Sequence, residues 1–211
     1  MEREEFGRSM IEMLGVLAIV GILSVGAISG FQKAMFKYKL QKTTEEYNMF
    51  FQDTLKYQKE LVNLRRGQKP GEGNHYQIGQ LLNDMGLVPA TWQQTGQLIY
   101  DRLNNIVNPK IHLTNNKLDF AIYVTTNDTS IFMCEAIYRD VFMQFSDNLL
   151  FVQTYRKDSE GSASGTNTYY GNLYCNGTTK KCIKDITFTD VKSACSVCED
   201  NDEVCIIKID F

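Results

Sequence analysis

The six cysteines have the most evident chemistry in this sequence, and all of them lie in the second half of the chain. Paired thiols can form disulfides, bind zinc or carry out redox exchange. The pair Cys195-Ser-Val-Cys198 is followed by an acidic run, which disfavours the thiolate that redox exchange needs. Zinc sites usually take two tight pairs, and this is the single tight pair. We therefore expect disulfides and an oxidising compartment. The candidates are Cys134, Cys175, Cys182, Cys195, Cys198 and Cys205.

Other chemistry has little support in the sequence. The chain has only two histidines, His75 and His112, and no nucleophile–base arrangement stands out, so we expect a protein that is not an enzyme. A formal net charge of -3 argues against general nucleic-acid binding. One acidic run is a weak candidate for a cation site, because clustered carboxylates suit calcium. The alternative is that this run is a solvated acidic turn. Its candidate ligands are Glu199, Asp200, Asp202 and Glu203, and no other cofactor is predicted.

An apolar run near the N-terminus has the length of a membrane span. From Met13 to Phe31 the chain has 19 residues without a charge, and a helix needs roughly 20 to cross a bilayer. A secretory signal peptide would have a shorter apolar core after a basic start, whereas this chain begins MEREEFG. A simple single-span anchor is the other alternative. Glu12 favours a more specific role, because a carboxylate at the edge of the bilayer core is costly without a partner.

The stretch from Gly7 to Leu14, GRSMIEML, followed by the apolar run, resembles the prepilin signature of type IV pilins and type II secretion pseudopilins. This sequence has Arg8 where the family usually has an apolar residue, and its leader is acidic rather than basic. The resemblance implies that a prepilin peptidase cuts between Gly7 and Arg8 and methylates the new amine of Arg8. It also implies that Glu12 acts in filament assembly, facing the amine of a neighbouring subunit.

The resemblance also implies a location and a set of partners. The precursor would span the bacterial inner membrane once, with its globular domain in the periplasm, and would then join an extracellular or periplasmic filament. Its partners would be other copies of itself, other pilins, the prepilin peptidase and the inner-membrane assembly platform. We therefore expect a structural subunit of a type IV pilus or pilus-like filament. The alternatives are a type II secretion pseudopilin, a minor tip pilin acting as an adhesive binding module, and, last, a membrane-anchored enzyme.

The elements that must position these residues predict an α+β fold. Steps of three and four residues continue the apolar helix to about Arg65 as an amphipathic helix. Its inward stripe is Phe36, Leu40, Thr43, Tyr47, Phe50, Thr54, Tyr57, Leu61 and Leu64. Its outer side is Lys39, Lys42, Glu45, Glu46, Asp53, Lys56 and Lys59. The predicted parts are a leader (1–7), a hydrophobic transmembrane or filament-core helix (8–31), its amphipathic continuation (32–66) and a globular domain (67–211).

In the globular domain, the long helix is expected to pack on an antiparallel sheet. A short helix over 76–85, ended by Gly86 and followed by Leu-Val-Pro, is similar to the longer-chain branch of type IV pilins. Alternation predicts a half-buried strand over 118–125. The remaining predicted elements are a helix over 129–145, strands over 149–155 and 205–211, and a mobile polar loop over 158–168.

The disulfide pairing follows in part from these elements. Cys175 and Cys182 flank a predicted hairpin with Asn176-Gly177 at its turn, so a bridge would staple its base. Cys134 and Cys205 both face inward in the predicted elements. A bridge between them would be similar to the C-terminal disulfide loop of many type IV pilins. The remaining two cysteines would then bond each other or exchange roles with Cys205.

Overall fold

The computed structural model describes residues 10–64, 75–113, 115–125, 129–157, 160–199 and 204–211, without the side chain of Ile11. The chain divides into two compact units, of which the first ends at Lys39 and the second extends from Leu40 to Phe211. Helix α1 (Met10–Lys56) continues from the first unit into the second.

The described part of the first unit is helical throughout. Its apolar side chains are exposed, as at Leu14 (66%) and Ile22 (74%). Among the described residues, α1 is the helix that is long and apolar enough to cross a membrane, by length and composition. A signal sequence near the N-terminus would meet the same criteria. The helix therefore has the dimensions of a membrane anchor.

The second half of α1 buries one face in the second unit. Thr43, Tyr47, Phe50 and Thr54 are buried, as their spacing predicted. Phe51, which lies beside the predicted stripe, is buried as well. Its ring centroid lies 5.0 Å from that of Phe120 on the sheet. Aromatic side chains therefore supply much of the contact between this helix and the sheet.

The amphipathic helix is interrupted before Leu64. After the single turn residue Tyr57, a separate helix α2 (Gln58–Leu64) follows. The Thr54 hydroxyl donates to the Phe50 carbonyl (2.7 Å), and the Tyr57 amide bonds the Thr54 carbonyl, three residues back (3.2 Å). The second of these bonds, to a carbonyl three residues back, is of the 3-10 type and interrupts the regular ladder of the α-helix. The prediction that Tyr57 and Leu64 face inward is wrong, because both are exposed.

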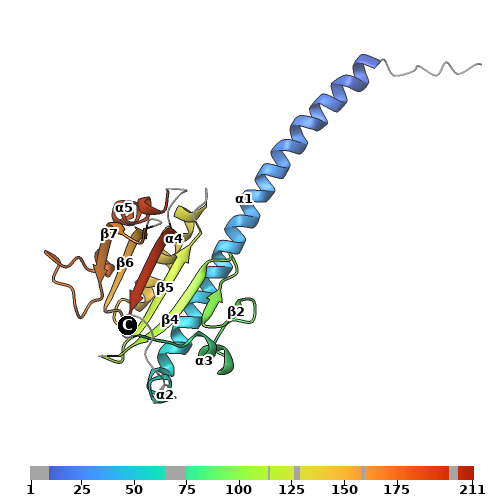
Figure 1. The fold of residues 1–211 in the computed structure, drawn as a ribbon. Coiled ribbons are helices and arrows are strands. Elements are labelled where there is room, and N and C mark those ends of the chain that lie inside the picture. The colour runs from blue at the N-terminus through green and yellow to red at the C-terminus, as the bar shows by residue number, and fades with distance from the viewer. Residues whose placement is uncertain (1–9, 65–74, 114, 126–128, 158–159, 200–203) are drawn as a thin grey trace, which may run out of the picture. The chain divides into compact units, whose positions relative to one another are not determined.

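An antiparallel sheet of eight strands forms the centre of the second unit (Figure 1). The strands are β1 (His75–Gln77), β2 (Gln93–Thr95), β3 (Leu98–Tyr100), β4 (Ile106–His112), β5 (Leu118–Val124), β6 (Phe151–Lys157), β7 (Ala163–Tyr170) and β8 (Val204–Asp210). Their order is β2-β3-β4-β5-β8-β6-β7, and β1 also pairs with β4. The strand nearest the C-terminus, β8, thus lies between β5 and β6 and joins the two halves of the sheet.

Helices cover one face of this sheet. The second half of α1 contacts β5 through Phe120. Helix α4 (Ser130–Asp140) reaches the same face, because the hydroxyl of Tyr138 lies 2.6 Å from that of Thr154 on β6. Helix α5 (Phe188–Cys195) packs against α4. The opposite face of β5 and β8 carries the charged side chains Asp119, Lys208 and Asp210 beside buried apolar ones such as Ile206.

Both helices predicted within the globular domain differ at their ends. The helix predicted over 76–85 begins only at Gly79 (α3, Gly79–Asp84), because Tyr76 pairs with β4 as part of β1. The predicted end is confirmed, since Gly86 follows with a φ of 70°. The helix predicted over 129–145 ends at Asp140 and continues as the 3-10 helix η2 (Phe142–Phe145).

The prediction of a mobile polar loop over 158–168 is wrong from Ala163 onward. These small polar residues form β7, because backbone hydrogen bonds to β6 do not depend on the side chains. A bulge sets Gly165 and Thr166 against the single residue Tyr155, and Gly165 adopts a φ of 65°. Such a bulge bends an outer strand and protects its free edge from pairing with another chain.

Candidate functional site

The residues that carry the prepilin resemblance lie at the start of α1. Gly7 and Arg8, the predicted cleavage and methylation site, lie outside the described residues. Glu12 lies in the first turn of α1 and is exposed. A carboxylate at a helix N-terminus is favoured by the helix dipole. The next acidic residue along the chain is Glu45. Between residues 10 and 44, Glu12 is therefore the single negative charge of the helix.

Two buried disulfides join the helices to the central strand. Cys134 on α4 bonds Cys195 at the end of α5. Cys198, in the 3-10 helix η4 (Ser196–Cys198), bonds Cys205 at the start of β8. The predicted pairs Cys134–Cys205 and Cys195–Cys198 do not form. The observed pairing is the predicted alternative, in which Cys195 and Cys205 exchange roles. The packing of α5 on α4 brings Cys195 to Cys134, which leaves the next cysteine for β8.

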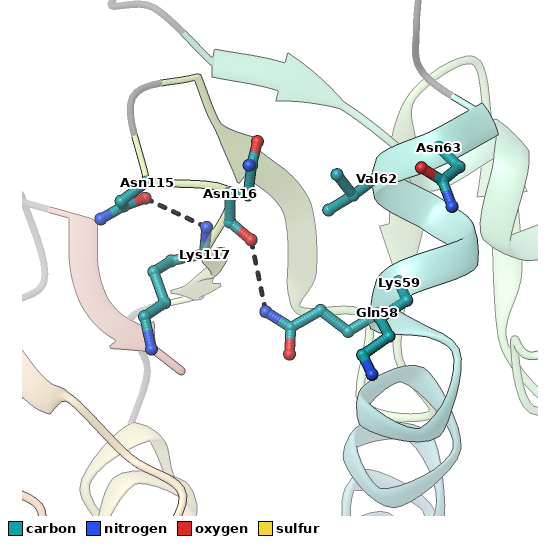
Figure 2. Close-up of a pocket in the computed structure, with 7 residues that line it drawn as sticks. All are labelled: Gln58, Lys59, Val62, Asn63, Asn115, Asn116 and Lys117. Carbon is teal, nitrogen blue, oxygen red and sulfur yellow. Dashed lines mark hydrogen bonds between the residues drawn. The ribbon is translucent and has the colours of Figure 1, made fainter.

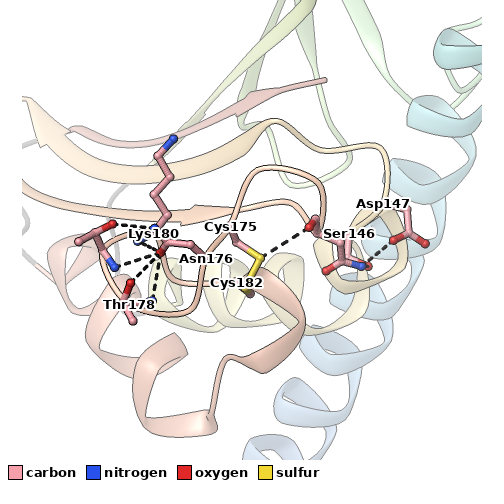
Figure 3. Close-up of a disulfide and its surroundings, with 9 residues drawn as sticks. Ser146, Asp147, Cys175, Asn176, Thr178, Lys180 and Cys182 are labelled. Atoms are coloured by element: carbon pink, nitrogen blue, oxygen red, sulfur yellow. Dashed lines mark hydrogen bonds between the residues drawn. A yellow bond between two sulfur atoms is a disulfide. The ribbon is translucent and has the colours of Figure 1, made fainter.

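The third disulfide, Cys175–Cys182, is confirmed (Figure 3). The residues between its cysteines form a turn rather than two paired strands. The Asn176 side-chain oxygen accepts the amides of Thr178 (3.1 Å) and Lys180 (2.8 Å), and Gly177 adopts a φ of 72°. The predicted Asn-Gly turn is therefore present, and side-chain hydrogen bonds take the place of a strand ladder.

The predicted calcium site is only partly described. Glu199 is exposed just after η4, and Asp200, Asp202 and Glu203 lie outside the described residues. Among the residues that the structure does describe, no three His, Cys, Asp or Glu side chains are grouped as metal ligands. Calcium binding at the acidic run stays a prediction.

A charged group on the face of the sheet opposite to α1 and α4 was not expected from the sequence. Asp119 on β5 lies directly opposite Asp210 on β8. The Nζ atom of Lys208 lies 3.4 Å from Oδ2 of Asp119 and 3.8 Å from Oδ1 of Asp210. The Nε2 atom of His75 lies 3.3 Å from Oδ2 of Asp119. We call these four residues the carboxylate cluster.

The carboxylate cluster is shielded from water, and its polar atoms are incompletely paired. Asp119 is only 4% exposed. Oδ1 of Asp119, Oδ1 of Asp210 and Nε2 of His75 are buried and lack a hydrogen-bond partner among the described residues. Burial raises the pKa of the Asp210 carboxyl to about 6, and the charge of Asp119 adds to this rise. Burial also lowers the pKa of the His75 imidazole, although Asp119 opposes that change.

A second buried charge, Glu46, fixes α1 to the rest of the second unit. The prediction that Glu46 lies on the outer side of the helix is wrong. Its carboxylate accepts hydrogen bonds from the Thr91 hydroxyl (2.7 Å), the Trp92 indole (2.9 Å) and the Arg102 guanidinium. Burial alone would raise the pKa of this carboxyl, but these hydrogen bonds outweigh burial and lower it. No sequence pattern around Glu46 predicts this site, because its three donors lie 45 or more residues further along the chain.

An open pocket of about 560 Å³ lies between α2 and the β4–β5 turn (Figure 2). A hydrogen bond from the Gln58 amide to the Asn116 carbonyl (3.3 Å) crosses it. The described residues that line it are amides, amines and one valine, a set that suits a polar ligand and includes no carboxylate or imidazole. They are Gln58, Lys59, Val62, Asn63, Asn115, Asn116 and Lys117.

These sites supply packing, cross-linking and buried charge. Comparisons with protein-family models, with curated proteins and with solved structures found no match to this chain. The two buried disulfides and the hydrogen bonds of Glu46 join α1, α4, α5 and β8 to the rest of the second unit.

Proposed function

We propose that this protein is a structural subunit of a type IV pilus or a pilus-like filament, processed by a prepilin peptidase. One observation carries the proposal. Helix α1 joins Glu12 and an uncharged apolar segment directly to the core of the second unit, where Tyr47 and Phe50 are buried. Gly7, five residues before Glu12, supplies the matching cleavage site.

The proposed mechanism is packing rather than catalysis. In the precursor, the apolar part of α1 crosses the inner membrane. In the filament, the same segments from many copies bundle, and Glu12 neutralises the amine of Arg8 on a neighbouring copy. Three disulfides support a location of the second unit outside the cytoplasm, because disulfides persist in oxidising compartments.

Replacement of Glu12 by Ala tests the proposal. Membrane insertion should be unaffected, since Ala is less costly than Glu in hydrocarbon. Filament assembly should fail, because removal of one partner of a buried pair costs about 3–5 kcal/mol and the loss recurs at every subunit. We expect monomer in the inner membrane and little protein in the sheared surface fraction.

The matched control is Ser24→Ala on the same helix, where the hydroxyl bonds only the Val20 carbonyl of its own helix. This variant should assemble like the wild type. Mass spectrometry should find that all three proteins begin at a methylated Arg8. Equal surface display of the wild type and Glu12→Ala would refute the filament role. Retention of residues 1–6 in cells with a prepilin peptidase would refute the processing step.

A further inference from the structure

The carboxylate cluster has a geometry that the filament proposal does not use. Asp119 and Asp210 occupy directly opposed positions on neighbouring antiparallel strands, so their side chains project on the same face. Opposed residues in such a pair have Cβ atoms about 4.5–5.5 Å apart, and like charges there are destabilising. The repulsion lies at the centre of the sheet, because β8 is the strand that joins its two halves.

The positive groups around this pair do not neutralise it fully. Lys208 is shared by both carboxylates, and its Nζ atom also lies 5.5 Å from the centre of the Phe151 ring. His75 reaches only Asp119. The Asp210 side chain is 13% exposed, so water screens its charge poorly. Charged and titratable groups also act on the cluster from the neighbouring segments. They are Lys110, which lies directly opposite Asp119 on β4, His112 on β4, Lys117 just before β5, and Tyr155 on β6.

The unpaired atoms show what the cluster lacks. Oδ1 of Asp119 and Oδ1 of Asp210 are buried and lack a partner at hydrogen-bond distance among the described residues, since Nζ of Lys208 stays 3.8 Å from the latter. A proton on either carboxyl removes one of the two negative charges. Protonation thus relieves the repulsion between the opposed side chains. The same logic governs carboxylate pairs that hold one proton between them.

We propose that Asp119 and Asp210 form an acid-responsive pair that holds β5 against β8 more firmly when one proton is shared between them. The pair acts as a regulatory device in the second unit, which becomes more stable as the surroundings turn from neutral to mildly acidic. This behaviour is opposite to ordinary acid denaturation, in which paired carboxylates lose their partners. The inference is independent of the filament proposal.

The pKa of Asp210 gives the size and sign of the effect. A rise from 3.8 to about 6 means that the folded state binds the proton about a hundredfold more tightly than the unfolded state. Between these two values the folded state carries more protons, so stability falls as the pH rises through this window. Well above pH 6 the folded state carries the full destabilisation from the ionised Asp210 carboxylate. His75 acts in the opposite sense, because its lowered pKa favours the neutral form in the folded state.

The test compares Asp210→Asn with the wild type as full-length chains in detergent micelles. Urea unfolding is followed by the fluorescence of Trp92, the only tryptophan of the chain, which is buried. At pH 7.5 the variant should have a folded-to-unfolded ratio up to about a hundredfold higher than the wild type. The two ratios should converge toward pH 4. His75 is present in both proteins, so its titration largely cancels in the comparison.

Asp185→Asn is the matched control, since it changes the net charge equally at an exposed position. It should follow the wild type at every pH. A variant Asp210→Asn that is less stable than the wild type at pH 7.5, or that fails to fold, would overturn the proposal. A stability gain of the same size at pH 4 and pH 7.5 would overturn it as well, because the gain would then not depend on a proton.

Discussion

Glu46→Gln tests how firmly the second half of α1 is fixed in the second unit. The substitution keeps the shape of the side chain but removes its charge. It also replaces one acceptor oxygen with an NH₂ group. Because the Thr91 hydroxyl and the Arg102 guanidinium both donate to this carboxylate, the new amide would place donors against donors.

The size of the effect follows from the burial of the two charges. The Glu46 side chain is 9% exposed and that of Arg102 is 30% exposed. Breaking a fully buried pair costs about 3–5 kcal/mol, whereas exposed pairs contribute about 0–1 kcal/mol. With one partner half-buried, we expect the free energy of unfolding to fall by about 2–3 kcal/mol.

The assay is urea unfolding followed by far-UV circular dichroism, since Trp92 itself donates to Glu46 and would change its fluorescence locally. The neighbouring Glu45→Gln is the matched control. Glu45 pairs with Lys42 across the exposed side of the helix. Loss of this exposed ion pair in Glu45→Gln should therefore change the urea midpoint only slightly.

The pH dependence gives a second measure. The hydrogen bonds to Glu46 hold its pKa below the ordinary value of 4.5. The stability that the ionised form contributes is therefore fully present above pH 4.5 and is lost as the pH falls through the folded-state value. The difference in the free energy of unfolding between Glu46→Gln and the wild type should therefore become smaller at acidic pH. Equal midpoints for Glu46→Gln and Glu45→Gln at neutral pH would refute this account of the site.

Two further predictions concern the covalent and backbone constraints of the second unit, and both are measured as urea midpoints by circular dichroism. Removal of Cys134–Cys195 by paired Ala substitutions should lower the free energy of unfolding by about 4 kcal/mol. Removal of Cys175–Cys182 should lower it by only about 2.5 kcal/mol, because this disulfide closes a much shorter loop. Equal losses would contradict the loop-size argument. Gly171→Ala should prevent stable folding, since its Cβ would lie 1.8 Å from the Leu149 carbonyl oxygen. Gly177→Ala is the control, because an added Cβ there meets no atom within 4 Å. It should lower the free energy of unfolding by about 1 kcal/mol, since Gly177 has a positive φ. Similar urea midpoints for Gly171→Ala and Gly177→Ala would show that the contact at Gly171 relaxes.

Patterns within a few residues of each other predicted the local structure well. The spacing of Tyr47 and Phe50 predicted the buried face of α1, because helix geometry alone places such residues on one side. Cys175 and Cys182 were paired correctly, since a short turn with Asn-Gly brings their ends together. The helix break at Tyr57 was missed, because a Thr54 hydroxyl can bond its own helix without ending it.

The sequence by itself determined a long helix with an apolar first part, an α+β domain and oxidisable cysteine pairs. Only the tertiary structure decided which distant groups meet. Insertion of β8 between β5 and β6 sets Asp210 opposite Asp119, and the packing of α5 on α4 pairs Cys134 with Cys195. The helical pattern predicts that Glu46 faces solvent, whereas the fold places Arg102 and Trp92 as donors to its carboxylate. Local periodicity reports the face of one element, whereas these contacts depend on the order in which elements pack, and no short stretch of sequence encodes that order.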